Sequence, residues 1–146
     1  MNLNRLNIVL ADDDKDDCSF FAKALMEIPI DTNLTIVHDG EKLMNYLYGN
    51  SEHLPDVLFL DLSMPRKNGV ECLSEIKEST QLKDLLIVMF STSFPQEKNY
   101  EENMISLLLK LGAHDYIRKS VDLEQLRKVI HKTLIMVEEK NLLIGK

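Results

Sequence analysis

The sequence is poor in cysteine, in basic charge and in long apolar runs, and each scarcity excludes a class of protein. Its 146 residues include two cysteines, Cys18 and Cys72, which lie too far apart to match a C-x-x-C metal or redox motif. Lys and Arg number 17 against 24 Asp and Glu, and the resulting net charge of -7 argues against nonspecific binding to nucleic acid or to an anionic membrane. No apolar stretch approaches the roughly 20 residues of a membrane span, and the first apolar run is too short for a signal peptide. We therefore expect a cytoplasmic protein with two buried thiols.

Linkers are scarce as well. No segment is rich in proline or glycine, and there is no internal repeat or low-complexity tract. A chain of this length fits one domain with a sizeable core. We expect a single domain over 1–146, with its core at about 5–139, a last helix that ends near Glu139 and a short tail at 140–146.

In place of linkers the sequence has a strict alternation of short apolar runs and longer amphipathic stretches. The runs lie at Leu6–Ala11, Leu34–His38, Val57–Leu60, Leu85–Phe90 and Asp115–Arg118. Their near-continuous hydrophobicity is typical of strands buried on both faces of a parallel sheet. The stretches between them carry apolar residues at helical spacing, and parallel strands need helical crossovers. The sequence therefore predicts a doubly wound α/β fold with a five-stranded parallel sheet and helices on both faces.

Polar and charged residues follow the predicted strands, at the edge where such folds form their sites. These residues are Asp12 and Asp13, Asp61, Ser91 and Thr92, and Lys119. Crowded carboxylates repel one another and raise each other's pKa unless a cation intervenes, and their hard oxygen atoms suit Mg²⁺. A carboxylate beside a hydroxyl and an ammonium group can also act as a nucleophile toward phosphorus. The residues thus predict a Mg²⁺-assisted phosphoryl-transfer site with an aspartate acceptor.

The acidic run at 12–17 combines two adjacent features. Asp12 and Asp13 belong to the predicted metal site. Asp14 is placed to cap the first helix, and Asp16 and Asp17 fall in its first turn, where the helix dipole favours negative charge. The run does not fit an EF-hand loop, because the required glycine and terminal glutamate are missing at the expected offsets. We expect only the first two aspartates to take part in the site.

Together these motifs resemble the receiver domain of bacterial two-component response regulators, over nearly the whole chain. The most specific piece is "LDLSMPRKNG", which matches the family pattern D-x-x-M-P-x-x-x-G and marks Asp61 as the phosphoacceptor. The resemblance implies a flavodoxin-like sheet with strand order 2-1-3-4-5. It also implies a Mg²⁺ site formed by Asp12, Asp13, Asp61 and the backbone carbonyl of Ser63.

The same resemblance assigns roles at the ends of the last two strands. "FSTS" places Ser91 at the switch hydroxyl, and "DYIRK" places Lys119 at the phosphate-contacting lysine and Tyr116 at the aromatic switch. The implied reaction moves a phosphoryl group to Asp61 from a phosphohistidine on a sensor histidine kinase or a histidine phosphotransfer protein. Pulling Ser91 inward would let Tyr116 turn toward the interior and change the outer surface. We expect a single-domain regulator that catalyses its own phosphoryl transfer and dephosphorylation and passes the signal to a downstream protein by contact.

Three features depart from the family pattern. Ser120 follows the lysine where the family usually has a proline in a cis peptide bond, a feature shared with some phytochrome-linked members. A cis bond before a non-proline residue costs about 2.5–4 kcal/mol, so either the site bears this strain or the bond is trans. The span from Ser91 to Lys119 is longer than usual, which predicts a longer loop or an extended fourth helix around "FPQEKNYEENM". The fourth strand also lacks the proline that often opens it.

The extended segment is more apolar than one buried stripe requires. Its helical face consists of Tyr100, Met104, Leu107, Leu108 and Leu111, with Ile105 and Leu109 beside it. The surplus suggests a surface for a partner or for a homodimer. The four histidines are scattered, and we interpret them as structural or exposed, with only His114 near the site.

Two other interpretations compete with a phosphorylated receiver. One is an interaction module with a receiver fold that works without phosphorylation, and the complete set of site residues argues against it. The other is a hydrolase or a nucleotide-binding flavodoxin-like protein. No glycine-rich phosphate loop follows the first strand, and the carboxylates there would repel a phosphate in the absence of metal.

Overall fold

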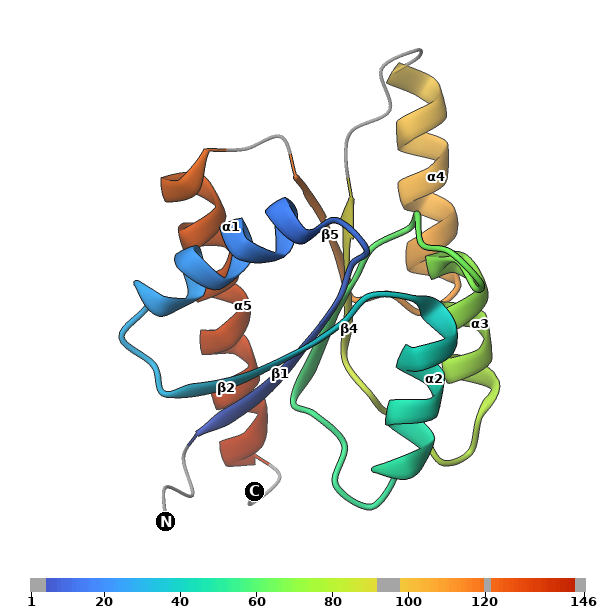
Figure 1. The fold of residues 1–146 in the computed structure, drawn as a ribbon, viewed down its shortest axis with the longest axis horizontal. Helices are drawn as coiled ribbons and strands as arrows, with labels where there is room; N and C mark the ends of the chain where they lie inside the picture. The colour runs from blue at the N-terminus through green and yellow to red at the C-terminus, as the bar shows by residue number, and fades with distance from the viewer. Residues whose placement is uncertain (1–4, 92–97, 120–121, 144–146) are drawn as a thin grey trace.

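A computed structural model describes residues 5–91, 98–119 and 122–143 of the chain (Figure 1). Strands and helices alternate along these residues. In chain order they are β1 (Leu6–Ala11), α1 (Lys15–Met26), β2 (Thr32–Val37), α2 (Gly40–Gly49), β3 (Val57–Leu60), α3 (Gly69–Glu78), β4 (Ile87–Ser91), α4 (Lys98–Lys110), β5 (Asp115–Arg118) and α5 (Leu123–Leu143).

The strands form one parallel sheet in the order β2-β1-β3-β4-β5. Figure 1 shows α1 and α5 on one side of this sheet and α2, α3 and α4 on the other. The predicted doubly wound fold is therefore confirmed, including the strand order that the resemblance implied. Every strand runs in the same direction, so all five carboxyl ends meet at one edge of the sheet.

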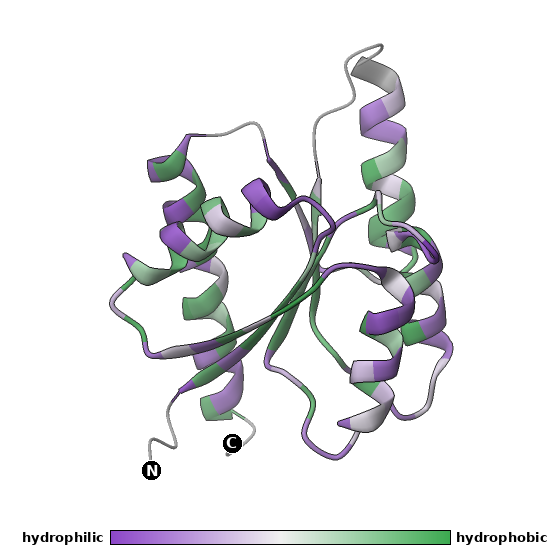
Figure 2. Ribbon diagram, in the orientation of Figure 1, coloured by the Kyte–Doolittle hydropathy of each residue, from purple (hydrophilic) through white to green (hydrophobic). Residues whose placement is uncertain are grey.

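Two cores, one on each face, hold the layers together. Phe21 of α1 packs edge to face against Phe59 of β3 and Phe90 of β4, with ring centroids 4.9 and 5.5 Å apart. On the opposite face Val9 and Leu58 pack against the other three helices. Both faces of β1, β3 and β4 are buried, which is why their sequences are almost continuously apolar (Figure 2). Both cysteines are buried as expected.

The element boundaries agree closely with those predicted. The first, third and fifth strands begin and end at the expected residues. The second strand is shifted toward the N-terminus and lies at Thr32–Val37, whereas the fourth is shifted toward the C-terminus and lies at Ile87–Ser91. Of the longer segment expected between the last two strands, 92–97 lie outside the described residues, and α4 follows them.

The end of α5 was predicted wrongly. The helix continues to Leu143 instead of ending near Glu139. The side-chain amide of Asn141, in the last turn of α5, donates to Asp56 Oδ1 at 3.1 Å. This tertiary contact holds the end of the helix in place, where the sequence has no further apolar stripe. In the described part of the chain no helix is both long and apolar enough to cross a membrane.

Candidate functional site

Three carboxylates converge at the carboxyl edge of the sheet. Asp12 and Asp13 come directly after β1, and Asp61 comes directly after β3. One oxygen from each lies within 4.8 Å of the other two. Asp12 and Asp61 are buried, whereas Asp13 is exposed. The structure thus brings together the three aspartates that the sequence predicted for a metal site.

The backbone of the sheet holds the two buried aspartates in place. The Asp61 N–H donates to the carbonyl of Ala11 at 2.9 Å, and the Asp12 N–H donates to the carbonyl of Val37 at 3.0 Å. The Asp14 N–H donates to Asp12 Oδ1 at 3.0 Å, which fixes the orientation of that carboxylate. The other oxygen, Asp12 Oδ2, is buried, and Lys119 Nζ lies 2.7 Å from it. A buried carboxylate needs positive charge beside it, because its own charge has been taken out of water.

Lys119 supplies a positive charge at the centre of this group. Its ammonium nitrogen lies 2.7 Å from Asp12 Oδ2, 2.9 Å from Asp17 Oδ2 and 3.3 Å from Asp61 Oδ2. Burial alone would lower the pKa of Lys119, but the contacts with Asp12 and Asp17 and the charge of Asp61 outweigh it, so the pKa lies above its usual value. The lysine is therefore charged, and its side chain is only 7% exposed.

One ammonium group does not neutralise this many carboxylates. Burial raises the pKa of Asp61 to about 6; Lys119 opposes the increase and the charge of Asp12 adds to it. Burial also raises the pKa of Asp12, more than Lys119 lowers it. Both buried carboxyls thus resist ionisation, because taking their charge out of water is costly. An additional cation would remove that cost.

Ser63 lies beside Asp61, and Ser91 lies at the carboxyl end of β4. The Ser63 N–H donates to Asp61 Oδ1 at 3.4 Å, so its backbone lies beside the carboxylate. Ser91 is buried at the end of β4, and its carbonyl accepts a hydrogen bond from the Lys119 N–H at 2.8 Å. Thr92 and Ser120 lie outside the described residues. The choice between a cis and a trans Lys119–Ser120 bond therefore lies outside them as well.

Tyr116 occupies β5, opposite Met89 of β4 in the register of the sheet. Its hydroxyl is buried and has no hydrogen-bond partner among the residues that the structure describes. Burial raises the pKa of this hydroxyl, and the charge of Asp61 raises it further. The ring packs with the apolar cluster on the α4 side of the sheet. The hydroxyl is thus buried without a partner among residues 5–91, 98–119 and 122–143.

The loop from Asp61 to Gly69 turns back onto the backbone of Asp61. Its conformation explains why the D-x-x-M-P-x-x-x-G motif ends in glycine. Arg66 adopts a left-handed conformation with φ of 69°, and the Gly69 N–H donates to the carbonyl of Leu62 at 2.9 Å. A Cβ at Gly69 would lie 2.2 Å from the Asp61 carbonyl oxygen, so only glycine fits. Asn68 then starts α3 with a capping box formed with Glu71.

Comparisons with known proteins identify the family to which the chain belongs. The chain matches the model of the response regulator receiver domain over residues 8–131. It belongs to this family. Receiver domains are the signalling modules of two-component systems, and the relatives of this chain are response regulators rather than enzymes that turn over an external substrate.

Individual relatives agree with this assignment. The response regulator Rcp1 of Synechocystis sp. is 32% identical over 127 residues, which cover 84% of this chain and 82% of Rcp1. The crystal structure of the Mn(2+)-bound form of Rcp1 has a TM-score of 0.72 at 30% identity, over 87% of this chain and 90% of that chain. The phosphorylated cyanobacterial phytochrome response regulator RcpA has a TM-score of 0.74 at 33% identity, over 88% of this chain and 91% of that chain. The likeness to phytochrome-linked regulators is thus confirmed.

Two contacts in this receiver domain were not predicted. Asp17, expected only to favour the helix dipole, accepts a hydrogen bond from Lys119 Nζ. His38 lies near the site instead of His114, because His38 follows the carboxyl end of β2, and its Nδ1 lies 3.0 Å from the Asp12 carbonyl oxygen. His114 precedes β5 and therefore lies at the opposite edge of the sheet, where its N–H donates to Ile87.

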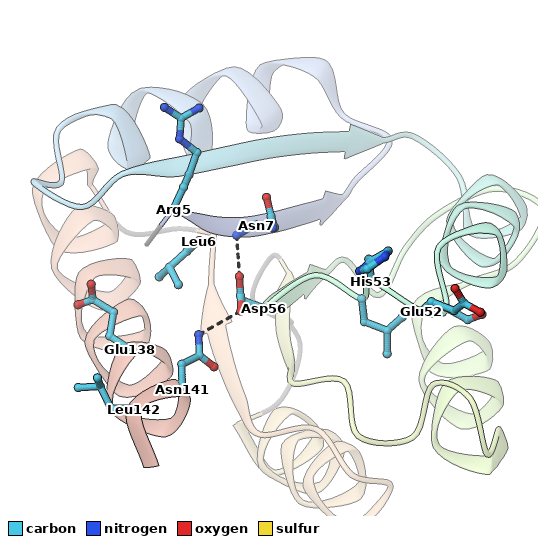
Figure 3. A pocket seen from close by; sticks show the side chains of 11 residues that line it. Arg5, Leu6, Asn7, Glu52, His53, Asp56, Glu138, Asn141 and Leu142 are labelled. Carbon is cyan, nitrogen blue, oxygen red and sulfur yellow. Dashed lines mark hydrogen bonds between the residues drawn. The ribbon is translucent and has the colours of Figure 1, made fainter. Parts of the chain in front are cut away.

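A hollow of the receiver domain lies far from the carboxylates, at the opposite edge of the sheet. It has a volume of about 560 Å³ and lies at the amino edge of the sheet, between the start of β1, the segment 51–56 and the end of α5 (Figure 3). Asp56 lines it, but the N–H of Asn7 at 2.8 Å and the amide of Asn141 already occupy both oxygens of this carboxylate. This aspartate ties the segment to β1 and α5.

Proposed function

We propose that this receiver domain accepts a phosphoryl group on Asp61 from a phosphohistidine donor and needs Mg²⁺ to do so. The observation that carries the proposal is the position of Asp61, with Lys119 Nζ 3.3 Å from its Oδ2 and the carboxylates of Asp12 and Asp13 beside it. A nucleophilic carboxylate next to a buried cation and a cluster of oxygen ligands suits phosphoryl transfer.

The residues of the cluster fit Mg²⁺. They offer three carboxylates whose oxygens lie within 4.8 Å of one another, and burial raises the pKa of Asp12 and Asp61, so a cation beside these oxygens would be favourable. Asp12, Asp13, Asp61 and the Ser63 carbonyl would hold the ion. A bound Mg²⁺ would offset the charge of these oxygens and of an incoming phosphoryl group. The Mn²⁺-bound form of Rcp1 supports a divalent cation in a related protein.

In the proposed reaction an oxygen of the Asp61 carboxylate forms a bond to phosphorus. The bond between phosphorus and the imidazole nitrogen of the donor breaks, and its electron pair stays with the imidazole. Lys119 and the hydroxyl of Ser91 would bind the phosphoryl oxygens, and the tight packing of Gly69 against Asp61 would hold the nucleophile in place. The donor is a histidine kinase or a histidine phosphotransfer protein, and water would later release the phosphoryl group.

The proposed output is a change of surface around α4 and β5. Ser91 would move toward the phosphoryl group, and Tyr116, whose hydroxyl has no described partner, would shift with it. On α4 the side chains of Tyr100, Leu107 and Leu109 are exposed, although Tyr100 and Leu107 were predicted to be on the buried face. We propose that this surface binds a downstream protein or a second copy of the chain. Size-exclusion chromatography with light scattering on both forms tests the homodimer, and a monomer in both states contradicts it.

Labelling with a small phosphodonor tests the proposed function. The full chain is incubated with acetyl phosphate and Mg²⁺, and the intact mass is measured with and without a chelator. We expect one phosphoryl group, stable in acid and labile in base, that is lost in Asp61→Asn and in the absence of Mg²⁺. If no label forms with this donor or with a cognate kinase, the domain is an interaction module that works without phosphorylation. A cytoplasmic location remains a prediction.

A further inference from the structure

A carboxylate outside the candidate metal cluster holds the lysine of the site. Asp17 lies in the first turn of α1, and its Oδ2 accepts a hydrogen bond from Lys119 Nζ at 2.9 Å. The two residues are 102 positions apart in the sequence. Asp17 is not one of the three aspartates whose oxygens lie within 4.8 Å of one another. This contact therefore serves neither the candidate metal site nor the capping of α1.

The number of donors on the ammonium group limits what Lys119 can bind. A lysine has three N–H donors, and here three carboxylates surround it. A phosphoryl group on Asp61 and a cation beside Asp12 would take over the two donors that face these carboxylates. Asp17 lies outside the metal cluster and holds the third donor. The ammonium can therefore turn fully to the phosphoryl oxygens only if its ion pair with Asp17 loosens.

We propose that Asp17 is a positioning residue that competes with the phosphoryl group on Asp61 for the ammonium of Lys119. The competition lowers the affinity of the site for the phosphoryl group. It also links the site to α1, because the half-buried Asp17 carboxylate loses its cation when the lysine turns to the phosphoryl oxygens. This inference rests on the proposed function of Asp61 and extends it to the regulation of the same site.

Asp16 provides a matched control in the same turn of the helix. The backbone N–H groups of Asp16 and Asp17 both donate to Asp14 Oδ1, at 2.9 and 3.1 Å. The two residues also carry the same charge close to the helix N-terminus. Asp16 is exposed, and within the described part of the chain it forms no ion pair with Lys119. Replacing either aspartate by asparagine removes the same charge from the same turn, but only one replacement frees the lysine.

The test measures the affinity for fluoroberyllate, a noncovalent analogue of the phosphoryl group, by fluorine NMR at saturating Mg²⁺. Loss of a competing ion pair predicts that Asp17→Asn binds the analogue roughly three- to tenfold more tightly than wild type. The affinity of Asp16→Asn should stay within about twofold of wild type, because this variant removes only an exposed charge. The affinity of Asp17→Glu should stay within the same range of about twofold, because this variant keeps the negative charge beside Lys119. Equal affinities of Asp17→Asn and Asp16→Asn, or weaker binding by Asp17→Asn, would overturn the inference.

A second titration separates competition for the lysine from direct repulsion between Asp17 and the anion. At about 1 M salt, repulsion across solvent is screened over a few ångströms, whereas exchange of a partner on a buried ammonium remains. We expect the ratio between the two asparagine variants to persist, and its loss would refute the competition. Failure of the proposed function looks different, because wild type would then bind no fluoroberyllate or would bind it equally well after Asp61→Asn.

Discussion

Gly69 lies directly against the backbone of Asp61, so closely that a methyl group at Gly69 would be 2.2 Å from the Asp61 carbonyl oxygen and 2.8 Å from Leu62 Cα. Backbone atoms cannot move aside as a flexible side chain can. The glycine of the motif thus sets the position of the residue that we propose as nucleophile.

Substitution of this glycine tests the relationship. We expect Gly69→Ala to lower the free energy of unfolding by roughly 2 kcal/mol or more, because the loop and the strand end must separate. Chemical denaturation measures the change. Gly49, the last residue of α2, is the control, since a Cβ there would meet nothing within 4 Å. Gly49→Ala should be as stable as wild type or more stable by up to about 1 kcal/mol. Equal stability of Gly69→Ala and wild type would contradict the close packing.

The raised pKa of Asp61 predicts a pH dependence of stability in the absence of metal. Burial raises this pKa from 3.8 to about 6, so the folded protein binds the proton more tightly than the unfolded chain. The resulting destabilisation is absent below about pH 4 and complete above about pH 6, and stability falls as the pH rises through this window. In the presence of a chelator, the free energy of unfolding of wild type should fall by on the order of 1–3 kcal/mol relative to Asp61→Asn as the pH rises through this window.

Urea denaturation of both proteins at a series of pH values measures this difference. Saturating Mg²⁺ should reduce the loss, because the ion stabilises the charged carboxylates. A difference between wild type and Asp61→Asn that does not change with pH would mean that the carboxyl of Asp61 titrates normally.

The ion pair between Glu101 of α4 and Arg118 of β5 predicts an asymmetry between two substitutions. The side chain of Glu101 is 6% exposed and that of Arg118 53% exposed, so only the glutamate has lost its hydration. Arg118→Met leaves a buried charge unpaired and should cost about 1–3 kcal/mol, whereas Glu101→Met should change stability by less than about 1 kcal/mol. Thermal or chemical unfolding of both variants checks this. A larger loss in Glu101→Met would show that the carboxylate stabilises α4 by other contacts.

Tyr116→Phe should not destabilise the protein. The Tyr116 hydroxyl is buried without a partner in the described part of the chain, and removing an unsatisfied hydroxyl is neutral or stabilises by up to about 1 kcal/mol. The same variant should still take up the phosphoryl group, because no hydrogen bond joins the hydroxyl to the described carboxylates. A loss of more than about 1 kcal/mol in a denaturation experiment would reveal a partner for this hydroxyl.

The sequence was sufficient for what depends on local pattern and on topology. Continuous apolar runs predicted the strands, and a parallel sheet necessarily brings Asp12, Asp61 and Lys119 to one edge. The cap at Asp14 followed from its place before the first helix, and it accepts the expected bonds from Asp16 and Asp17.

What the sequence did not reveal depends on how elements pack against one another. The contact between Asp17 and Lys119 requires the rotation of α1 on the sheet, which no local pattern specifies. The end of α5 depends on Asn141 reaching Asp56, 85 residues away. The choice between His38 and His114 required knowing which end of each strand the histidine occupies.

Borohydride trapping shows which carboxylate accepts the phosphoryl group. Sodium borohydride reduces an aspartyl phosphate to homoserine, which marks the modified residue permanently for peptide mass spectrometry. After incubation of the full chain with acetyl phosphate and Mg²⁺, we expect homoserine at position 61 and unmodified aspartate at 12, 13 and 17. Conversion at one of those three positions, or no conversion at 61 while the chain is folded and Mg²⁺ is present, would contradict Asp61 as the acceptor.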